Sequence, residues 1–454
     1  MYGHRTWLIP CAIVITLAVC WLPGCGGGGG AAPPPPPPPP PPVEIGPGPG
    51  PAASAIPAEP AVSTVAARAV PFASAPSMAV ASAEAVARID ALADRPPATQ
   101  AELEAVLSDF TRWASAQPND PLSQAGLAAA IVICGAHNAG ISAGYTPSQV
   151  LSLLEPVTQI ASLRATMRSA AFPSPGEPDF SSANLQIGVR KFLLPALVHA
   201  RLRLDAVVST AGGSSVRLAE LPSRRGTHYA YRADFRALSG VLRGAQAILL
   251  QLCAYQFNPG TWDWTAALAG RDVNHDGLLQ TSEYLPPDPF GWRHNSSNMA
   301  LSGTHITGAL QSLIDAVREA PADSLLMQVC AGDRTTALAK LTDLQAMASG
   351  EVQARIEHEG GSGGAGSFTT PMRLKQLWEA PTDDLKDLFP TLAPASGSYW
   401  EALPRGASDF PRPQLGGVFA QPAPVMEMLA KGPTYIAMSY GSFGPITVID
   451  RRGQ

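Results

Sequence analysis

One run of twelve residues places oxygen-bearing side chains at alternate positions: Asp272-Val-Asn-His-Asp-Gly-Leu-Leu-Gln-Thr-Ser-Glu283. A hard divalent cation such as Ca²⁺ takes about six to eight oxygen ligands at roughly 2.3–2.6 Å. A short loop supplies these ligands when side-chain oxygens recur at every second residue and the chain then turns back sharply. The run therefore constrains the local fold more than any other part of the sequence, because it predicts a loop closed around one Ca²⁺ ion.

The spacing assigns a role to each ligand position of residues 272–283. Gly277 stands where the tight turn favours a residue free to adopt positive φ. The predicted metal ligands are the side chains of Asp272, Asn274, Asp276 and Glu283, a water held by Gln280, and the backbone carbonyl of Leu278. This pattern resembles the EF-hand calcium loop, in which the last glutamate binds with both carboxylate oxygens. The alternative is a solvated Asp/Asn/Gly turn that fits the pattern by chance.

The flanks of the loop favour a structural ion over a sensor. Residues 262–269 are expected to form a short entering helix, and Pro286 and Pro287 limit the exiting helix to about one turn. Sensors instead swing two long helices apart. We therefore expect Ca²⁺ to lock the connection between a helix ending near Gln256 and one beginning near Ser296, with an affinity of about 10⁻⁴ to 10⁻³ M. Aromatic side chains crowd this connection, and they either pack it onto the body or form a carbohydrate- or partner-binding surface: Trp262, Trp264, Tyr284, Phe290 and Trp292.

The N-terminal residues 1–24 have the layout of a secretory signal, with Arg5 followed by an apolar run over residues 8–21. Leu22-Pro-Gly-Cys25 at the end of that run resembles the lipobox of bacterial lipoproteins. The resemblance implies cleavage before Cys25, lipidation of that cysteine, and an extracytoplasmic protein anchored by lipid to the membrane of the bacterial cell envelope. The alternatives are an ordinary signal peptide, which releases a soluble secreted protein, and an uncleaved anchor.

Residues 25–80 predict a disordered stalk. Gly26–Gly30 is a glycine run, and Pro33–Pro42 is ten consecutive prolines. Polyproline rises about 3.1 Å per residue, so this part spans roughly 30 Å. The Ala-, Pro- and Ser-rich residues that follow bury too little apolar surface to offset the entropy of ordering. The stalk either holds a folded body clear of a surface or is a low-complexity tail without a spacing role.

Charge and cysteine content exclude some functions. The chain has 31 Lys and Arg against 36 Asp and Glu, a net charge of −5. This weak acidity argues against nucleic acid, which requires a basic footprint. After processing, Cys134, Cys253 and Cys330 remain, which allows at most one disulfide. We expect these three cysteines to be small core residues.

Residues 81–359 predict a helical domain that contains loop 272–283. Helix-period apolar patterns and capping signals mark the expected helices: 83–92, 99–117, 120–134, 146–169, 189–209, 231–256, 296–319 and 333–358. In the second of these, Thr99 and Glu102 form a capping-box pattern. The predicted fold class is mainly α, a multi-helix bundle or a helical-hairpin array. Phe110-x-x-Trp113-Ala followed by Pro118-Asn-Asp-Pro resembles a tetratricopeptide-like repeat boundary over one hairpin.

Residues 360–454 are expected to be irregular and rich in proline. Gly360–Gly366 is interpreted as a linker. Short helices are expected at 372–379 and 382–388, and strands 434–439 and 446–450 predict a small β-hairpin. This tail is either a small second domain or a strap across the helical body. We favour the strap, because so few long apolar elements make a poor independent core.

Two catalytic patterns carry little weight in their context. Gly140-Ile-Ser142-Ala-Gly144 fits a nucleophile elbow, but a helix and a Gly-Ala-His-Asn turn are expected before it instead of a strand. Gly361-Ser-Gly-Gly-Ala-Gly366 fits a dinucleotide fingerprint, but a charged helix is expected before it. The sequence therefore favours a calcium-binding, envelope-tethered scaffold that acts through protein or cell-envelope polymer contacts. The alternative is an extracytoplasmic hydrolase whose active site is assembled from distant residues.

Overall fold

The computed structural model describes residues 83–88, 91, 99–142, 186–211, 213–223, 226–255, 278, 280–284, 293, 296–330, 333–360, 364–381, 384–389, 391, 393–395, 398–403, 409, 417–431, 435–441 and 443–450. The described residues form a mainly α protein with a small antiparallel β region, which confirms the predicted fold class. The signal segment, Cys25, the stalk, the expected helices at 146–169 and 262–269, and most of the calcium loop lie outside the described residues.

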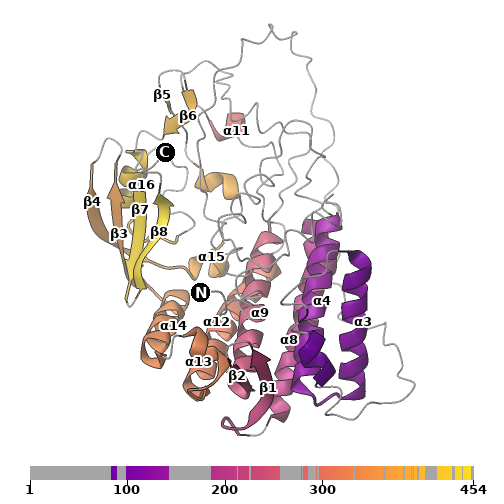
Figure 1. The fold of residues 1–454 in the computed structure, drawn as a ribbon. Coiled ribbons are helices and arrows are strands. Elements are labelled where there is room, and N and C mark those ends of the chain that lie inside the picture. The colour runs from indigo at the N-terminus through magenta and orange to yellow at the C-terminus, as the bar shows by residue number, and fades with distance from the viewer. Residues whose placement is uncertain are drawn as a thin grey trace, which may run out of the picture.

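In the described part of the chain, six long helices lie side by side, and each packs against the next of the six (Figure 1). They are α3 (Gln100–Ala116), α4 (Pro121–Ser142), α8 (Leu194–Thr210), α9 (Arg232–Leu252), α12 (Ser296–Glu319) and α14 (Arg334–Ser349). A short π-helical segment, η2 (Val189–Leu193), leads directly into α8. One continuous apolar core, including Phe110, Leu197 and Leu250, joins α3, α4, α8 and α9.

Helix α3 begins where the capping signal predicts. The Thr99 Oγ1 accepts a hydrogen bond from the backbone N–H of Glu102 at 3.2 Å. The Phe110 and Trp113 rings on this helix meet edge to face, with centroids 5.2 Å apart. A Cβ at Gly126 on α4 would lie 2.3 Å from Cδ1 of Phe110, so the absence of a side chain there lets α3 and α4 approach closely.

Helix α4 continues beyond its predicted end. The sequence places the helix end near Cys134 and a turn over residues 135–138, whereas α4 runs to Ser142. Gly135 lies inside the helix at its contact with α8. A Cβ there would lie 2.5 Å from the Cβ of Ala196, so the contact requires a residue without a side chain. Close packing of α4 against η2 and α8 therefore overrides the low helix propensity of glycine.

A hairpin precedes α9 that the sequence interpretation missed. Strands β1 (Arg217–Ser223) and β2 (Gly226–Tyr231) pair antiparallel, and the chain passes from β2 into α9 through its N-cap residue Tyr231. Helix α9 is the central helix of the row. It buries Phe235, Leu242, Ala245, Leu249 and Leu250, because it packs against α8 on one side and α12 on another.

The expected helix over 333–358 is wrong in its second half. Helix α14 ends at Ser349, Gly350 follows, and β3 (Val352–Glu359) begins two residues later. Val352, Ala354 and Ile356 point to the buried face while Gln353 and Arg355 are exposed. Buried and exposed residues thus alternate along this segment, as in a half-buried strand and not as in a helix.

The linker interpretation of Gly360–Gly366 is also wrong. Strand β4 (Gly366–Met372) pairs antiparallel with β3 along its whole length, so the chain between Glu359 and Gly366 joins two paired strands. Gly360 has φ 82° and Gly364 has φ 67°, which is the left-handed region that glycine adopts readily. The boundary predicted at residues 359 and 360 thus falls inside a supersecondary unit.

The C-terminal segment completes this sheet. Strands β7 (Tyr435–Tyr440) and β8 (Phe443–Asp450) form the predicted hairpin, and β7 pairs antiparallel with β3. The strand order is β4-β3-β7-β8, and α16 (Ala423–Ala430) packs against the sheet (Figure 1). Shorter elements lie between β4 and α16: α15 (Gln376–Glu379), η4 (Leu385–Leu388), β5 (Ala393–Ala395) and β6 (Ser398–Leu403).

The sheet has its own apolar clusters. One joins Ile356, Met426 and Ile436, and another joins Met347, Val352 and Met372. The sheet, α16 and the end of α14 are called the sheet unit below, and these clusters favour the alternative of a small second domain over the strap. This unit contacts the helical row through α14 and α15, both of which pack against α12.

Candidate functional site

The calcium loop is described only at its C-terminal end. Leu278, Gln280 and Glu283 are among the described residues, whereas Asp272, Asn274 and Asp276 are not. Gln280 immediately precedes the four-residue helix α11 (Thr281–Tyr284), a length that matches the single turn expected before the two prolines. Glu283 is half-buried and Gln280 is exposed.

Glu283 folds back onto the start of this helix. The backbone N–H of Gln280 donates to Oε2 of Glu283 at 2.7 Å, and the backbone N–H of Glu283 donates to the Gln280 carbonyl at 2.9 Å. A carboxylate has about four acceptor positions, so one such hydrogen bond is compatible with bidentate binding of a cation. The residues present at this end of the loop thus fit Ca²⁺, whose ligands are oxygens.

Within the described part of the chain, no group of three His, Cys, Asp or Glu side chains lies close enough to hold a metal ion. The acidic positions 272 and 276 fall outside that part. The predicted set of ligands therefore stays a prediction.

The segment between α9 and α12 contains the loop, and its two ends lie next to each other. Tyr255, just after α9, and Arg293, just before α12, form an isolated antiparallel bridge. The buried Gln186 side chain donates from Nε2 to the carbonyls of Leu252 and Tyr255 at 2.8 and 2.7 Å. These bonds satisfy carbonyls at the C-terminal end of α9. The base of the connection is thus fixed to the helical core.

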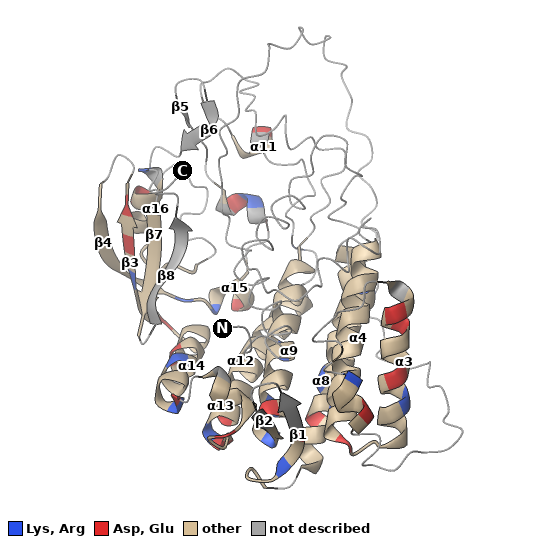
Figure 2. Cartoon of the chain, viewed as in Figure 1, with Lys and Arg blue, Asp and Glu red and all other residues tan. Residues whose placement is uncertain are grey.

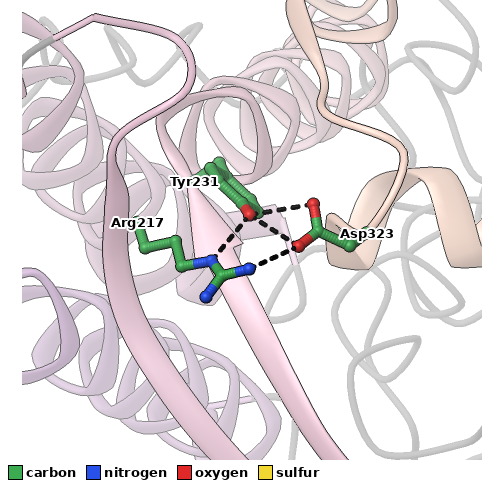
Figure 3. A network of polar contacts seen from close by, with 3 residues as sticks. All are labelled: Arg217, Tyr231 and Asp323. Carbon is green, nitrogen blue, oxygen red and sulfur yellow. Dashed lines mark hydrogen bonds and ion pairs between the residues drawn. The ribbon is translucent and has the colours of Figure 1, made fainter.

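A second polar site ties the β1–β2 hairpin to the turn before α13 (Leu325–Val329) (Figure 3). The Tyr231 hydroxyl donates to the Asp323 carboxylate, with both oxygens at 2.8 Å. Arg217 donates from Nε to the Tyr231 oxygen at 3.1 Å and pairs from Nη2 with Asp323 at 3.2 Å. The Arg217 guanidinium also lies 3.7 Å from the centroid of the Tyr229 ring.

The pKa shifts of Asp323 and Tyr231 in this second site indicate a structural role. The hydrogen bond from Tyr231 and the contact with Arg217 hold the pKa of Asp323 below its usual range. Burial raises the pKa of Tyr231 above its ordinary value. Asp323 therefore stays ionised and Tyr231 stays neutral near pH 7, so neither group is poised to exchange a proton.

Asp234 is a buried carboxylate at the third position of α9. Its Oδ2 accepts from the backbone N–H of Tyr231 at 2.7 Å, and its Oδ1 accepts from that of Leu326 at 2.6 Å. Burial raises its pKa to about 6 despite these hydrogen bonds. Asp234 therefore fastens α13 to the first turn of α9, and sequence inspection missed it because Leu326 lies far away in the chain.

The three cysteines among the described residues, Cys134, Cys253 and Cys330, are free thiols. Burial raises the pKa of Cys134 and of Cys253 to about 12, so both stay protonated near neutral pH. A thiolate is the reactive form of cysteine. Cys253 lies in the apolar core, as the sequence predicts, whereas Cys134 and Cys330 are only half-buried.

The discounted motifs lie in contexts that fit neither chemistry. Ser142 is the last residue of the continuous helix α4, whereas a nucleophile elbow follows a strand. The glycines up to Gly366 do follow a strand, β3, contrary to the sequence expectation, but they lead into β4. A dinucleotide fingerprint instead opens a helix.

Among the described helices, α4 is long and apolar enough to cross a membrane, and 56% of that span is buried inside the protein. It packs between α3 and α8, as the core helix of a folded domain does. Residues of both charge signs occur on α3, α14 and β3, whereas α4, β4 and β7 carry none (Figure 2). No protein-family model, curated protein or solved structure matches this chain.

Proposed function

We propose that this protein is a calcium-binding lipoprotein of the bacterial cell envelope, in which one Ca²⁺ ion has a structural role. Asp272, Asn274, Asp276, Leu278, Gln280 and Glu283 would hold the ion. Lipid on Cys25 would tether the chain to the membrane from the extracytoplasmic side. The helical body would act as a scaffold that contacts a protein or a cell-envelope polymer, held out on the Gly/Pro stalk.

The observation that carries the proposal is the twelve-residue spacing of oxygen ligands that ends at Glu283. The position of Glu283 in the single turn of α11 supports it, because an EF-hand loop continues into a helix. The short α11 also supports a structural ion, since a sensor needs a long second helix.

The bridge between Tyr255 and Arg293 explains how an ion bound in the loop would stabilise the fold. With both ends of the connection fixed at the core, a cation that gathers the loop oxygens removes conformational freedom from the segment between them. Ca²⁺ bound to the folded chain alone then stabilises it by mass action.

Calcium-dependent melting tests the metal site. For a dissociation constant of about 10⁻⁴ to 10⁻³ M, roughly 10 mM CaCl₂ should add about 1.4 to 2.7 kcal/mol to the free energy of unfolding. The double variant Asp272→Ala and Glu283→Ala should lose this effect, and Asp288→Ala, a nearby carboxylate outside the loop, should keep it. Equal melting of the wild type in CaCl₂ and in EDTA would refute the site.

The tether and the structural role have separate tests. Metabolic labelling with palmitate should mark the wild type and not Cys25→Ser, and a labelled serine variant would contradict lipidation at that residue. Calcium should leave the binding of an apolar dye unchanged. A large gain in dye binding would instead indicate a sensor that opens an apolar surface.

A further inference from the structure

Three polar side chains in the middle of helix α9 lie on one of its faces. Ser239, Arg243 and Gln246 follow one another at four- and three-residue steps, so they share a face. Gln246 is 1% exposed, and neither Nε2 nor Oε1 of its amide has a hydrogen-bond partner in the described structure. An unsatisfied buried amide is costly, and it indicates a missing polar partner.

Helix α8 brings an ion pair to this face. Nη1 of Arg201 lies 2.8 Å from Oδ2 of Asp205, and the Ser239 hydroxyl donates to Oδ1 of Asp205 at 2.5 Å. The carboxylate is thus engaged through both oxygens. The Arg201 side chain is 15% exposed, and its buried Nε has no partner among the described atoms.

Helix α12 contributes a glycine and a histidine from the opposite side. A Cβ at Gly308 would lie 2.5 Å from Nη1 and 3.0 Å from Cδ of Arg243, so the bare backbone gives the arginine its place against α12. His305 lies three residues earlier and therefore shares that face. Burial first, and then the charges of Arg201 and Arg243, lower the pKa of His305.

The charges in this cluster do not balance. Arg201 and Arg243 bring two positive charges, and Asp205 brings one negative charge. Within the described residues, Arg243 makes no hydrogen bond or ion pair, although it is half-buried. Burial lowers its pKa, Arg201 lowers it further, and Asp205 acts against both. A half-buried positive charge of this kind is stabilised by an anion.

We propose that Arg201, Arg243, Gln246 and His305 form a binding site for a small anion that carries carboxylate or phosphate oxygens. Guanidinium groups bind such oxygens through two parallel hydrogen bonds. The amide of Gln246 supplies a further donor at the buried end of the site. Neutral His305 donates through one ring nitrogen. The side chains of this site come from α8, α9 and α12, and none of them belongs to the calcium loop.

Anion titration of the purified, EDTA-treated protein tests the proposal. Sodium phosphate and sodium succinate, each compared with NaCl at equal ionic strength, are added up to about 10 mM while melting and binding heat are measured. At least one of the two should raise the melting temperature of the wild type, and the comparison identifies which oxygens are preferred. Arg243→Gln should weaken that binding at least roughly tenfold.

Matched controls separate the site from general effects of charge and of packing. Arg318→Gln removes an arginine from α12 whose side chain is 62% exposed, and it should bind the anion as the wild type does. Gly308→Ala should weaken binding by displacing Arg243. Gly244→Ala should not, because a Cβ there meets the Cβ of Ala309 at 3.8 Å, an ordinary contact.

Two results would overturn the assignment. One is a wild type whose melting temperature responds to neither anion beyond the NaCl control. The other is an Arg243→Gln protein, folded by circular dichroism, that binds as tightly as Arg318→Gln. Neither result bears on calcium, because every titration contains chelator.

Discussion

The row of helices and the four-stranded sheet differ in how far apart in the chain their partners lie. Each long helix packs against the next long helix of the row. In the sheet, by contrast, β3 (Val352–Glu359) pairs with β7 (Tyr435–Tyr440) across several intervening elements. Neighbouring helices can be recognised from local periodicity, whereas a strand is fully defined only by its distant partner.

The two cores also differ in composition. The core of the row includes the rigid rings of Phe110 and Trp113 and many small alanines. The clusters of the sheet unit rely on methionines: Met347, Met372, Met426 and Met428. Methionine adapts to irregular spaces, so a core built on it specifies its neighbours less sharply. We therefore expect the two regions to respond differently to loss of a core side chain.

The largest expected effect is in the row. Phe110 is fully buried between Trp113 and Gly126, so Phe110→Ala leaves a cavity that rigid neighbours cannot fill. We expect a loss of about 3–5 kcal/mol in the free energy of unfolding, measured by urea denaturation. Phe389→Ala, at a side chain that is 36% exposed, is the control and should cost far less. A similar loss for both variants would contradict the packing described for α3 and α4.

A smaller and local effect is expected in the sheet. Met426 on α16 is fully buried against β3 and β7, and Met426→Ala should cost about 2–4 kcal/mol. Hydrogen exchange should show lost protection in β3 and β7 and unchanged protection in α8 and α9. The exposed neighbour Glu427, replaced by alanine, is the control. Equal loss of protection in both regions would show that they unfold as one cooperative unit.

The sequence predicts most of the row because its signals are local. Thr99 is the N-cap of α3, and the helix expected at 296–319 coincides with α12. The end of α4 could not be predicted, because Gly135 is tolerated only through its close approach to Ala196. The alternation of Val352, Ala354 and Ile356 with polar residues was available in the sequence, but the preceding helical pattern in α14 concealed it.

The candidate sites also differ in whether their residues are close together in the sequence. The candidate calcium loop can be recognised in the sequence because its predicted ligands all lie within residues 272–283. The proposed anion site cannot be recognised in this way, because Arg201, Arg243 and His305 come from three helices. Asp234 lacked a sequence signal for the same reason, since the Leu326 backbone N–H that it binds is distant in the chain. Sites assembled across elements require the fold before they can be recognised.

Asp234 should make the stability of the helical row, but not that of the sheet unit, depend on pH. Its pKa in the folded protein is about 6, above the ordinary 3.8, so the folded state binds more protons than the unfolded state between these values. Stability from this group therefore falls as the pH rises from about 4 to about 6. Asp234→Asn should be less stable than the wild type by about 2 kcal/mol at pH 4, because its amide N–H₂ faces a backbone donor.

The stability gap between Asp234→Asn and the wild type should then narrow as the pH rises to 7, because asparagine has no charge to bury. Urea denaturation at several pH values measures this gap. A gap that widens instead would show that the backbone donors of Tyr231 and Leu326 outweigh burial and lower the pKa of Asp234. Protection of β3 and β7 should stay constant throughout, since Asp234 belongs to the helical row.

The smallest expected effect is at the contact between the two regions. A Cβ at Gly303 on α12 would lie 2.2 Å from Cδ1 of Trp378 on α15, so Gly303→Ala must displace this ring. Trp378 is half-exposed and can tilt outward, so we expect a cost of about 1 kcal/mol. Gly244→Ala, which replaces a glycine of α9 that faces Ala309 without a clash, should be neutral or stabilising.

Hydrogen exchange on the Gly303→Ala protein also tests whether the two regions are coupled. If this variant separates the unfolding of the sheet from that of the row, the Trp378 contact couples the two regions. If both still unfold together, the coupling lies in α14, which packs against α12 and continues through Gly350 into β3.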